Sequence, residues 1–372
     1  MTGLHNVHME ETLSRIHLSL RHYFIFWLLA IATLLVRFFC SRERSSIRRV
    51  AIVEPYGLGD IVSLQPLVSF LVHHGWSVHI VAQERWQPVL KNFQTGWSNV
   101  SGGWSIMGFK EFFMTCWRLK NEIPSGSIGI DPRGDVRSIF FLALAGCPQI
   151  YSLDHYIGTD LRLPWFLACL IKENAETHQR WQITKGFADA IESGASTWNK
   201  PDITHLVSGK PAPAPQRIGI VPVAPWKGKL WRPDAWAELI NQMVERGYEP
   251  VVVCGPNQHR ESVSATSGSN VPIAEAKTIK ELAETLRGCR AIVTLDTGPM
   301  HIASALNVPV VALFGTGQLP LWGPFSDRCE VVISPGFPKE SIHQVTNTIE
   351  VGESSMREIT CAQVWAAITR VL

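Results

Sequence analysis

The chain of 372 residues has almost no excess charge, because 34 Lys and Arg stand against 32 Asp and Glu and leave a net charge of +2. A protein that binds nucleic acid generally carries a clear basic bias or a basic face, so we expect no nucleic-acid partner. Short internal repeats and low-complexity tracts are also missing. With 46% hydrophobic and 18% charged residues, the composition excludes a disordered chain, and the length favours two globular domains.

Motifs for metals and redox cofactors are missing too. The eight cysteines include no CxxC pair and no neighbouring histidine cluster, which argues against a zinc site, and we interpret them as buried free thiols. No acidic DxD cluster is present to hold a metal-bound diphosphate. Val62 stands where a GxGxxG fingerprint starting at Gly57 needs its last glycine. We therefore predict no metal and no cofactor.

The N-terminal part contains one apolar run without charge, from Tyr23 to Val36, followed by Arg37. The run is short for a membrane span. We favour a membrane anchor, with an in-plane amphipathic helix and a cleaved signal peptide as alternatives, because basic residues rather than a cleavage site follow the run. Arginines are more numerous after the run than before it. The positive-inside rule then places the remaining chain on the cytoplasmic side of the inner membrane.

From residue 48 onward, short apolar strands alternate with amphipathic helices. The predicted strands are 50–53, 77–82, 127–130, 218–223, 250–255, 291–295 and 308–315. This alternation is typical of parallel, doubly wound sheets, which bind ligands at the carboxyl ends of their strands. Three prolines in 207–216 interrupt it. The predicted segments are an anchor with its basic flank (1–46), an N-terminal Rossmann-like domain (47–206), a linker (207–216), a C-terminal Rossmann-like domain (217–350) and a C-terminal helix (351–372).

The first loop of interest follows the strand 50–53 and reads Gly57-Leu58-Gly59-Asp60. Its two glycines permit a tight turn and a close approach of the backbone to a ligand. Asp60 has two interpretations. It can cap the helix that starts here, or it can face the cleft between the domains as a general base.

Two loops of the second half are also candidates for ligand binding. Lys229 lies between a strand and a helix, where it can reach a diphosphate or remain a solvated surface lysine. Thr297, Gly298 and the helix amides that follow form an anion site of the helix N-terminus type. His301 lies one turn into that helix, where it can face the cleft, although a lone histidine is more often structural.

Together these loops resemble those of glycosyltransferase family 9, the ADP-heptose:lipopolysaccharide heptosyltransferases. The resemblance covers roughly residues 50–335 and is carried by four motifs: GLGDIVSLQPL (57–67), DPRGDVRS (131–138), KLWRP (229–233) and DTGPMHIASALNVPVVALFGTGQLPLWGPF (296–325). It implies the GT-B fold, with two Rossmann-like domains facing a cleft, and inverting, metal-independent transfer from an ADP-sugar.

The resemblance also implies roles for single residues. Asp60 matches the catalytic base, and Gly57 and Gly59 form the turn before it. Asp131 and Arg133 fall on the acceptor side. The donor-site positions are Lys229 on the phosphates, Asn257 where the family often has a glutamate on the ribose, and the segment with Asp296, Thr297, Gly298 and His301.

We therefore expect an inverting glycosyltransferase. Its donor is a nucleotide-diphosphate sugar, with ADP-heptose favoured, and its acceptor is lipopolysaccharide or another glycan or lipid-linked molecule at the membrane. Two alternatives remain open, a Rossmann-type NAD-dependent oxidoreductase and a catalytically silent protein that only binds a nucleotide-sugar.

Overall fold

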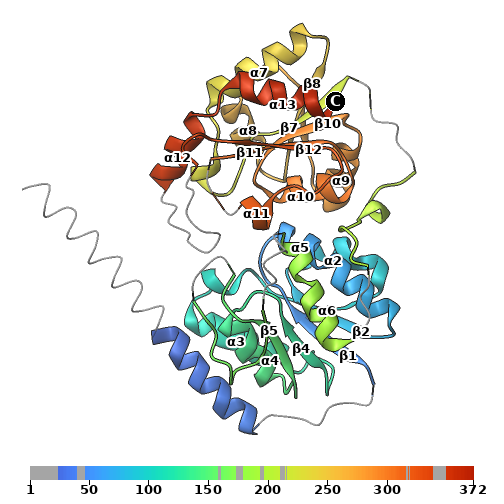
Figure 1. Cartoon of the computed structure of the whole chain (residues 1–372), viewed down its shortest axis with the longest axis vertical. Coiled ribbons are helices and arrows are strands. Elements are labelled where there is room, and N and C mark those ends of the chain that lie inside the picture. The colour runs from blue at the N-terminus through green and yellow to red at the C-terminus, as the bar shows by residue number, and fades with distance from the viewer. Residues whose placement is uncertain are drawn as a thin grey trace, which may run out of the picture.

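The protein consists of two α/β domains stacked along its long axis (Figure 1). The computed structural model describes residues 24–39, 47–157, 161–172, 179–192, 197–209, 214, 216–315, 317, 319–337 and 349–372. Each domain is built around one parallel sheet, as the alternation of strands and helices predicted. Half of the predicted linker, namely 210–213 and 215, lies outside the described residues.

The first sheet has the strand order β3-β2-β1-β4-β5-β6. Its strands are β1 (Arg49–Val53), β2 (Ser77–Ala82), β3 (Gly96–Asn99), β4 (Ile128–Asp131), β5 (Ile150–Leu153) and β6 (Cys169–Ile171). Its helices are α2 (Leu58–His73), η1 (Glu84–Phe93), η2 (Trp104–Ile106), α3 (Phe109–Leu119), α4 (Val136–Leu144), α5 (Arg180–Ile183), α6 (Lys185–Ile191) and η3 (Thr204–Leu206). Residues 50–53 of the central strand are buried because helices cover both faces of a parallel sheet.

The second sheet has the order β12-β11-β10-β7-β8-β9. Its strands are β7 (Arg217–Val221), β8 (Glu249–Cys254), β9 (Ile273–Glu275), β10 (Ala291–Leu295), β11 (Val310–Phe314) and β12 (Cys329–Ile333). Its helices are η4 (Lys227–Lys229), α7 (Pro233–Glu245), α8 (His259–Ala265), α9 (Ile279–Arg287), α10 (Gly298–Ala305), α11 (Leu319–Trp322), α12 (Ile349–Arg357) and α13 (Cys361–Val371).

The two domains share one hydrophobic cluster at their junction. Buried side chains of α2, such as Ile61, belong to the same cluster as buried side chains of α10, such as Met300. A hydrogen bond also crosses the junction, since Nε2 of Gln179 in the first domain donates to the carbonyl oxygen of Pro324 in the second at 3.1 Å. The ends of α2 and α10 that follow the central strands are therefore held near each other.

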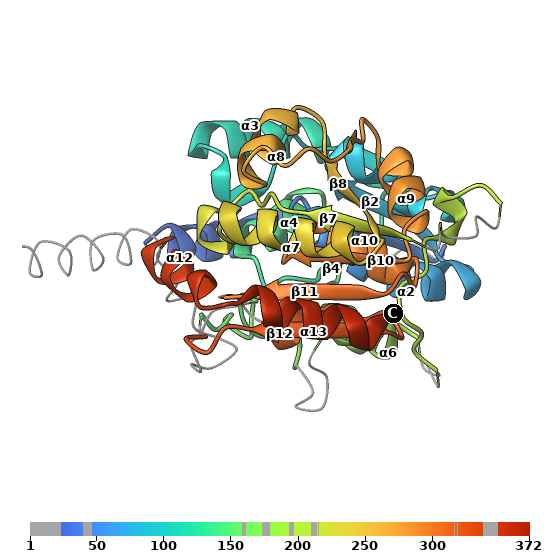
Figure 2. The same ribbon diagram turned by 90° about the horizontal axis from the view of Figure 1, so that it is seen from above.

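The C-terminal helices cover the second sheet. Figure 2 shows α13 alongside β11 and β12, and its buried residues belong to the same core as those of α7. Thr360 and Gln363 form the predicted capping box, in which Oγ1 of Thr360 accepts from the N–H of Gln363 at 3.3 Å.

The N-terminal apolar run forms a helix over residues 24–39, here called the N-terminal helix. Within the described part of the chain, no helix is long and apolar enough to cross a membrane. The predicted spanning segment is thus not supported. One side of the helix instead packs into the first domain, with Phe26, Leu29 and Ala30 buried. The rest of the predicted anchor and its flank, 1–23 and 40–46, lies outside the described residues.

Gly134 allows a test of how the loop after β4 packs against the backbone of His155. Its φ is +74°, and a Cβ at this position would lie 1.8 Å from the carbonyl oxygen of His155. Gly247 has a φ of +80° but open space around it. We expect Gly247→Ala to lower the free energy of unfolding by about 1–2 kcal/mol, the cost of a left-handed alanine. Gly134→Ala should cost about 1–3 kcal/mol more, because of the clash. Equal losses in denaturant unfolding would contradict the placement of this loop.

Candidate active site

The candidate site forms where the carboxyl ends of the central strands of both sheets meet at the domain junction. In the first sheet β1 pairs with β4, so the loops that follow these strands are neighbours. In the second sheet β7 lies between β8 and β10, which brings the loops after these three strands to one edge. The predicted site residues therefore come from both domains.

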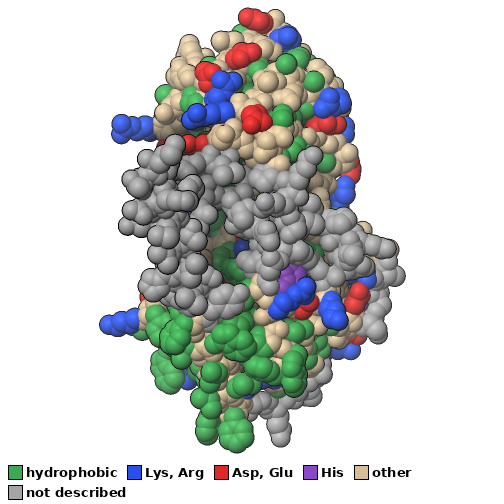
Figure 3. Space-filling model, turned by 60° about the vertical axis from the view of Figure 1, so that its left-hand side comes forward, with side chains coloured by type: hydrophobic (Ala, Val, Ile, Leu, Met, Phe, Trp, Pro, Cys, Tyr) green, Lys and Arg blue, Asp and Glu red, His purple; other side chains and the backbone are tan. Residues whose placement is uncertain are grey.

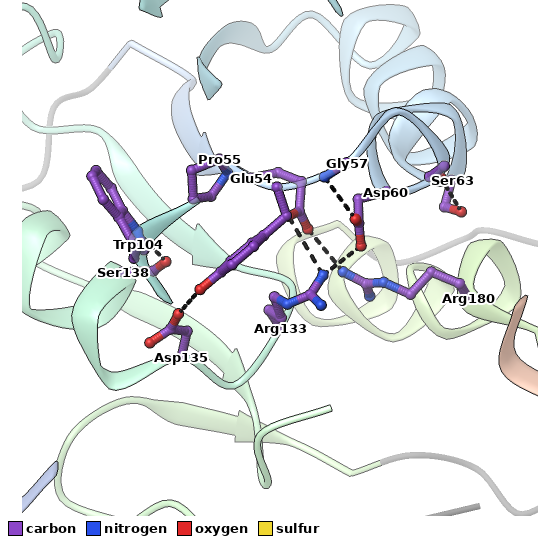
Figure 4. Close-up of polar contacts among 12 residues, drawn as sticks. Glu54, Pro55, Gly57, Asp60, Ser63, Trp104, Arg133, Asp135, Ser138 and Arg180 are labelled. Atoms are coloured by element: carbon purple, nitrogen blue, oxygen red, sulfur yellow. Dashed lines mark hydrogen bonds and ion pairs between the residues drawn. The ribbon is translucent and has the colours of Figure 1, made fainter. Parts of the chain in front are cut away.

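Asp60 stands in the first turn of α2 and has two partners (Figure 4). Its Oδ2 accepts a hydrogen bond from the backbone N–H of Gly57 at 2.9 Å, which is the contact of a capping carboxylate. Its Oδ1 forms an ion pair with Nη1 of Arg133 at 2.5 Å, and the side chain is 12% exposed. Capping thus occupies only one oxygen and leaves the second oxygen to face the loop after β4.

Glu54, the first residue after β1, lies fully buried beside Asp60. Its Oε2 is 3.1 Å from Nη2 of Arg180, and its Oε1 is 3.8 Å from Nη1 of Arg133. Burial raises the pKa of Glu54 to about 8, the charge of Asp60 adds to the rise, and the two arginines oppose it. Among the described residues, Oε1 has no hydrogen-bond partner. Arg133 is therefore shared between two carboxylates and lies closer to Asp60.

Asp131 ends β4, and its carboxylate organises the loop that follows. It accepts hydrogen bonds from the hydroxyl of Ser152 and the backbone N–H of Asp135, both at 2.7 Å. It also accepts from the N–H of Arg133 at 3.2 Å. Burial raises the pKa of Asp131 to about 7. Of the two residues predicted on the acceptor side, Arg133 reaches Asp60, whereas Asp131 faces inward and fixes the turn.

Lys229 lies in the second domain beside Asp296, the first residue after β10. Its Nζ is 2.5 Å from Oδ2 of Asp296 and 3.3 Å from the backbone oxygen of the same residue. The lysine side chain is 27% exposed, so an anion can reach the ammonium by competing with Asp296. Helix α12 packs closely against η4, the short helix that ends at Lys229. A Cβ on Gly352 of α12 would lie 2.4 Å from the carbonyl oxygen of Gly228.

The start of α10 provides a second group for an anion. Thr297 is the N-cap residue, and its hydroxyl donates to the carbonyl of Leu295 at 3.3 Å rather than capping the helix. Pro299 occupies the first turn, where its missing N–H is not needed. The N–H groups at a helix start have no acceptor within the helix, and this end carries partial positive charge. Lys229 and this helix start therefore flank Asp296.

His301 joins the two domains. A Cβ on Gly59 would lie 2.5 Å from Cδ2 of His301, and a Cβ on Gly298 would lie 3.0 Å from Cδ2 of Leu58. Both glycines are therefore required by the close approach of α2 and α10. Burial lowers the pKa of His301, and the charges of Asp296 and Asp60 only partly oppose the shift, so the imidazole is neutral at pH 7.

Asn257 lies on the same edge of the second sheet but apart from this cluster. It follows β8 with a φ of +63°, and its N–H donates to Oε1 of Glu275 at 2.7 Å. Within the described residues, no hydrogen bond or ion pair joins Asn257 to Lys229 or to the segment 296–301. The structure thus joins Lys229 to Asp296 by a direct contact, whereas the described contact of Asn257 is with Glu275.

Three residues that the sequence did not single out contribute to the site. Glu54 supplies the second carboxylate, Arg180 its ion-pair partner, and Tyr56 a ring 4.1 Å from the guanidinium of Arg133. Glu54 and Tyr56 directly follow a predicted strand, a position that marks them as candidates. Arg180 carried no such signal, because it comes from α5 and reaches Glu54 only in the folded chain.

Known proteins share sequence and fold with this chain. Residues 170–350 match the family model of glycosyltransferase family 9 (heptosyltransferase). Over 115 residues the chain is 33% identical to lipopolysaccharide heptosyltransferase 1 of Pseudomonas aeruginosa, an alignment that covers 30% of this chain and 32% of that relative. The aligned part of this chain therefore covers about a third of the length of that relative.

Two solved structures have the same overall fold. A glycosyl transferase family 9 structure from Veillonella parvula gives a TM-score of 0.68 at 16% identity, covering 89% of this chain and 98% of that one. The E. coli heptosyltransferase WaaC with ADP gives a TM-score of 0.66 at 16% identity, covering 87% of this chain and 100% of that one. The predicted resemblance to family 9 is confirmed, and the matched segment 170–350 contains both motifs of the second half.

The buried Glu54 predicts a pH dependence of stability. The folded protein keeps a proton on Glu54 that the unfolded chain releases, because burial raises its pKa from 4.5 to about 8. The free energy of unfolding therefore falls as the pH rises through this window, by up to about 1.4 kcal/mol per pH unit. Glu54→Gln mimics the protonated form, so this decline should become shallower in denaturant unfolding.

Glu245→Gln is the matched control for this measurement, since Glu245 is exposed on α7. It should leave the pH dependence as in the unchanged protein. Asp131, whose pKa is also raised by burial, is present in both variants and contributes equally to each. Parallel curves for Glu54→Gln and Glu245→Gln would show that Glu54 is ionised in the folded protein.

Proposed function

We propose that this protein is an inverting glycosyltransferase that moves a sugar from a nucleotide-diphosphate sugar to a glycan or lipid-linked acceptor. The observation that carries the proposal is the contact of Gly59 with His301. It brings a carboxylate of the first domain, Asp60, to the same junction as the cation and helix start that flank Asp296 in the second domain. A base and an anion site then face each other across the domain boundary.

In the proposed reaction, Asp60 takes the proton from an acceptor hydroxyl. The acceptor oxygen attacks the anomeric carbon, and the bond to the diphosphate breaks on the opposite side, which inverts the configuration. Asp60 Oδ1 is paired with Arg133, but a carboxylate oxygen has a second lone pair that can accept the hydroxyl proton. Lys229 and the amides of α10 stabilise the negative charge on the departing diphosphate.

The donor is proposed to be an ADP-sugar, with heptose favoured, and the acceptor lipopolysaccharide or a related molecule. The support comes from the family model, from the relative named lipopolysaccharide heptosyltransferase 1, and from the likeness to WaaC, whose structure contains ADP. We expect transfer to need no added cofactor or divalent metal, because Lys229 and the helix start supply the positive charge. An NAD-dependent oxidoreductase is not favoured by these similarities, and transfer distinguishes an enzyme from a silent binding protein.

We also propose that the protein works at the cytoplasmic face of the inner membrane. The support is the apolar N-terminal run with its basic flank, including Arg48 and Arg49, because basic residues beside an apolar segment are attracted to the anionic lipids of the cytoplasmic leaflet. A lipid-linked acceptor is concentrated in the plane where such a protein resides.

Asp60→Asn tests the assignment of the base. Asparagine retains an oxygen that can accept the N–H of Gly57, but it cannot take a proton. The rate of sugar transfer, followed by release of ADP, should therefore fall by about 10²–10⁴-fold. Calorimetric affinity for ADP should change little, because the proposed nucleotide site belongs to the second domain. If the rate of transfer stays near that of the unchanged protein, Asp60 has only structural roles, as the partner of the Gly57 N–H and of Arg133.

Lys229→Ala tests the anion site. The affinity for ADP, measured by calorimetry, should weaken by about 1.5–3 kcal/mol, the range for a hydrogen bond to a charged group. The change also leaves Asp296 without its cation, which adds repulsion toward a diphosphate. Lys227→Ala, at an exposed position of the same short helix, is the control and should leave the affinity unchanged. Equal effects of the two substitutions would remove Lys229 from the site.

A further inference from the structure

Exposed apolar side chains are concentrated on one part of the first domain. Among the described residues, only three exposed large hydrophobic side chains belong to the second domain: Val244, Val263 and Ile333. Eight others lie on the N-terminal helix, and Figure 3 shows hydrophobic side chains gathered over the lower part of that face of the molecule. Contiguous apolar surface of this kind marks a site of interaction with protein or membrane.

The N-terminal helix is apolar on two opposite sides. Its inner stripe consists of Phe26, Leu29, Ala30 and Thr33, which are at most 5% exposed. Its outer stripe is formed by large side chains that are 43–85% exposed, namely Phe24, Trp27, Leu28, Ile31, Leu34, Leu35, Phe38 and Phe39. A helix that is apolar all round is normally covered on every side. The first domain covers only the inner stripe, so we expect the outer stripe to contact a second apolar partner or medium.

The first domain holds this helix along its length. The inner stripe belongs to the same hydrophobic cluster as buried residues of α3 and α4, such as Phe112 and Phe140. At the other end of the helix, Nη1 of Arg37 donates to the carbonyl of Leu167 at 2.7 Å. The helix therefore lies against the first domain and shares a core with α3 and α4, while its outer stripe faces away from that core.

Neighbouring elements add aromatic side chains to the outer stripe. Ile106 on η2 and Phe109, Met114 and Trp117 on α3 are 53–81% exposed. Trp165, two residues from the carbonyl that binds Arg37, is 82% exposed. Tryptophan is enriched where one end of a side chain meets lipid and the other meets water.

Cations accompany these aromatic residues. Nζ of Lys120 lies 3.7 Å from the ring of Trp117, and Lys110 and Arg118 are exposed on the same helix. Between 109 and 122, three basic residues stand beside two acidic ones, Glu111 and Glu122, which leaves a small basic excess. Basic residues beside an exposed apolar and aromatic face are the combination that binds anionic lipid surfaces.

We propose that the outer stripe of the N-terminal helix, the exposed side chains of η2 and α3, and Trp165 form one docking face for an anionic phospholipid bilayer. The N-terminal helix lies in the plane of the membrane, with one side in the domain core and the other among the lipids. This deepens the membrane location proposed above by naming the surface and its mode of contact. It does not depend on the chemistry at Asp60.

The test is binding of the purified full-length chain to phosphatidylcholine vesicles with and without phosphatidylglycerol, measured by co-sedimentation without donor or acceptor. The triple variant Leu28→Gln, Ile31→Gln and Leu35→Gln changes exposed positions only. Its partition coefficient on anionic vesicles should fall at least about tenfold, because three aliphatic side chains no longer leave water. The matched control is Val244→Gln with Val263→Gln on the second domain, which should bind as the unchanged protein does.

A second variant, Trp117→Gln with Trp165→Gln, tests whether separate elements share the face. It should also weaken binding, whereas an anchor made of the N-terminal helix alone would be unaffected and would overturn the shared face. Equal vesicle binding by the outer-stripe variant and its control would overturn the proposal. It would also be overturned if the unchanged protein did not bind vesicles but formed a dimer that the outer-stripe variant dissociates. Transfer to a water-soluble acceptor separates the outcomes, since loss of vesicle binding with retained transfer leaves the proposed function intact.

Discussion

The site depends on one cluster of buried carboxyl groups and arginines at the end of β1. Glu54 and Asp60 stand on either side of the glycine turn, and Arg133 lies within ion-pair distance of both. Arg180 reaches Glu54 from α5, at 3.1 Å, and also lies 6.0 Å from the ring of Trp322 in the second domain. Removing one member of a buried ion pair costs about 3–5 kcal/mol, so the pair of Asp60 and Arg133 ties the loops after β1 and β4 together.

The second constraint is that two helix starts meet at the domain junction. The N-termini of α2 and α10 both carry partial positive charge, and Asp60 and Asp296 are the carboxylates beside them. In this arrangement the cations of the site are already paired, Arg133 with Asp60 and Lys229 with Asp296. In the proposed reaction, an incoming diphosphate competes with Asp296 for Lys229, so binding of the proposed donor is coupled to a rearrangement of charge in the second domain.

The N-terminal helix shows how one apolar run can have two uses. Its composition alone suggested a membrane anchor, because fourteen uncharged residues do not reveal which side meets protein. In the folded protein, one stripe completes the core of the first domain and the opposite stripe remains exposed. The helix thus contributes to the stability of the domain as well as to its surface. Only packing against α3 and α4 separates these two roles.

The sequence by itself determined the two parallel sheets, the loops that follow their central strands and the family resemblance. These features follow from local periodicity, turn residues and short motifs, which a linear pattern records. Tertiary structure decided that Asp60 both caps α2 and pairs with Arg133, that Gly59 must accommodate His301, and that Arg180 donates to Glu54. These contacts join residues far apart in the chain. Their energies depend on distance and burial, and both are set only when the sheets twist and the domains pack.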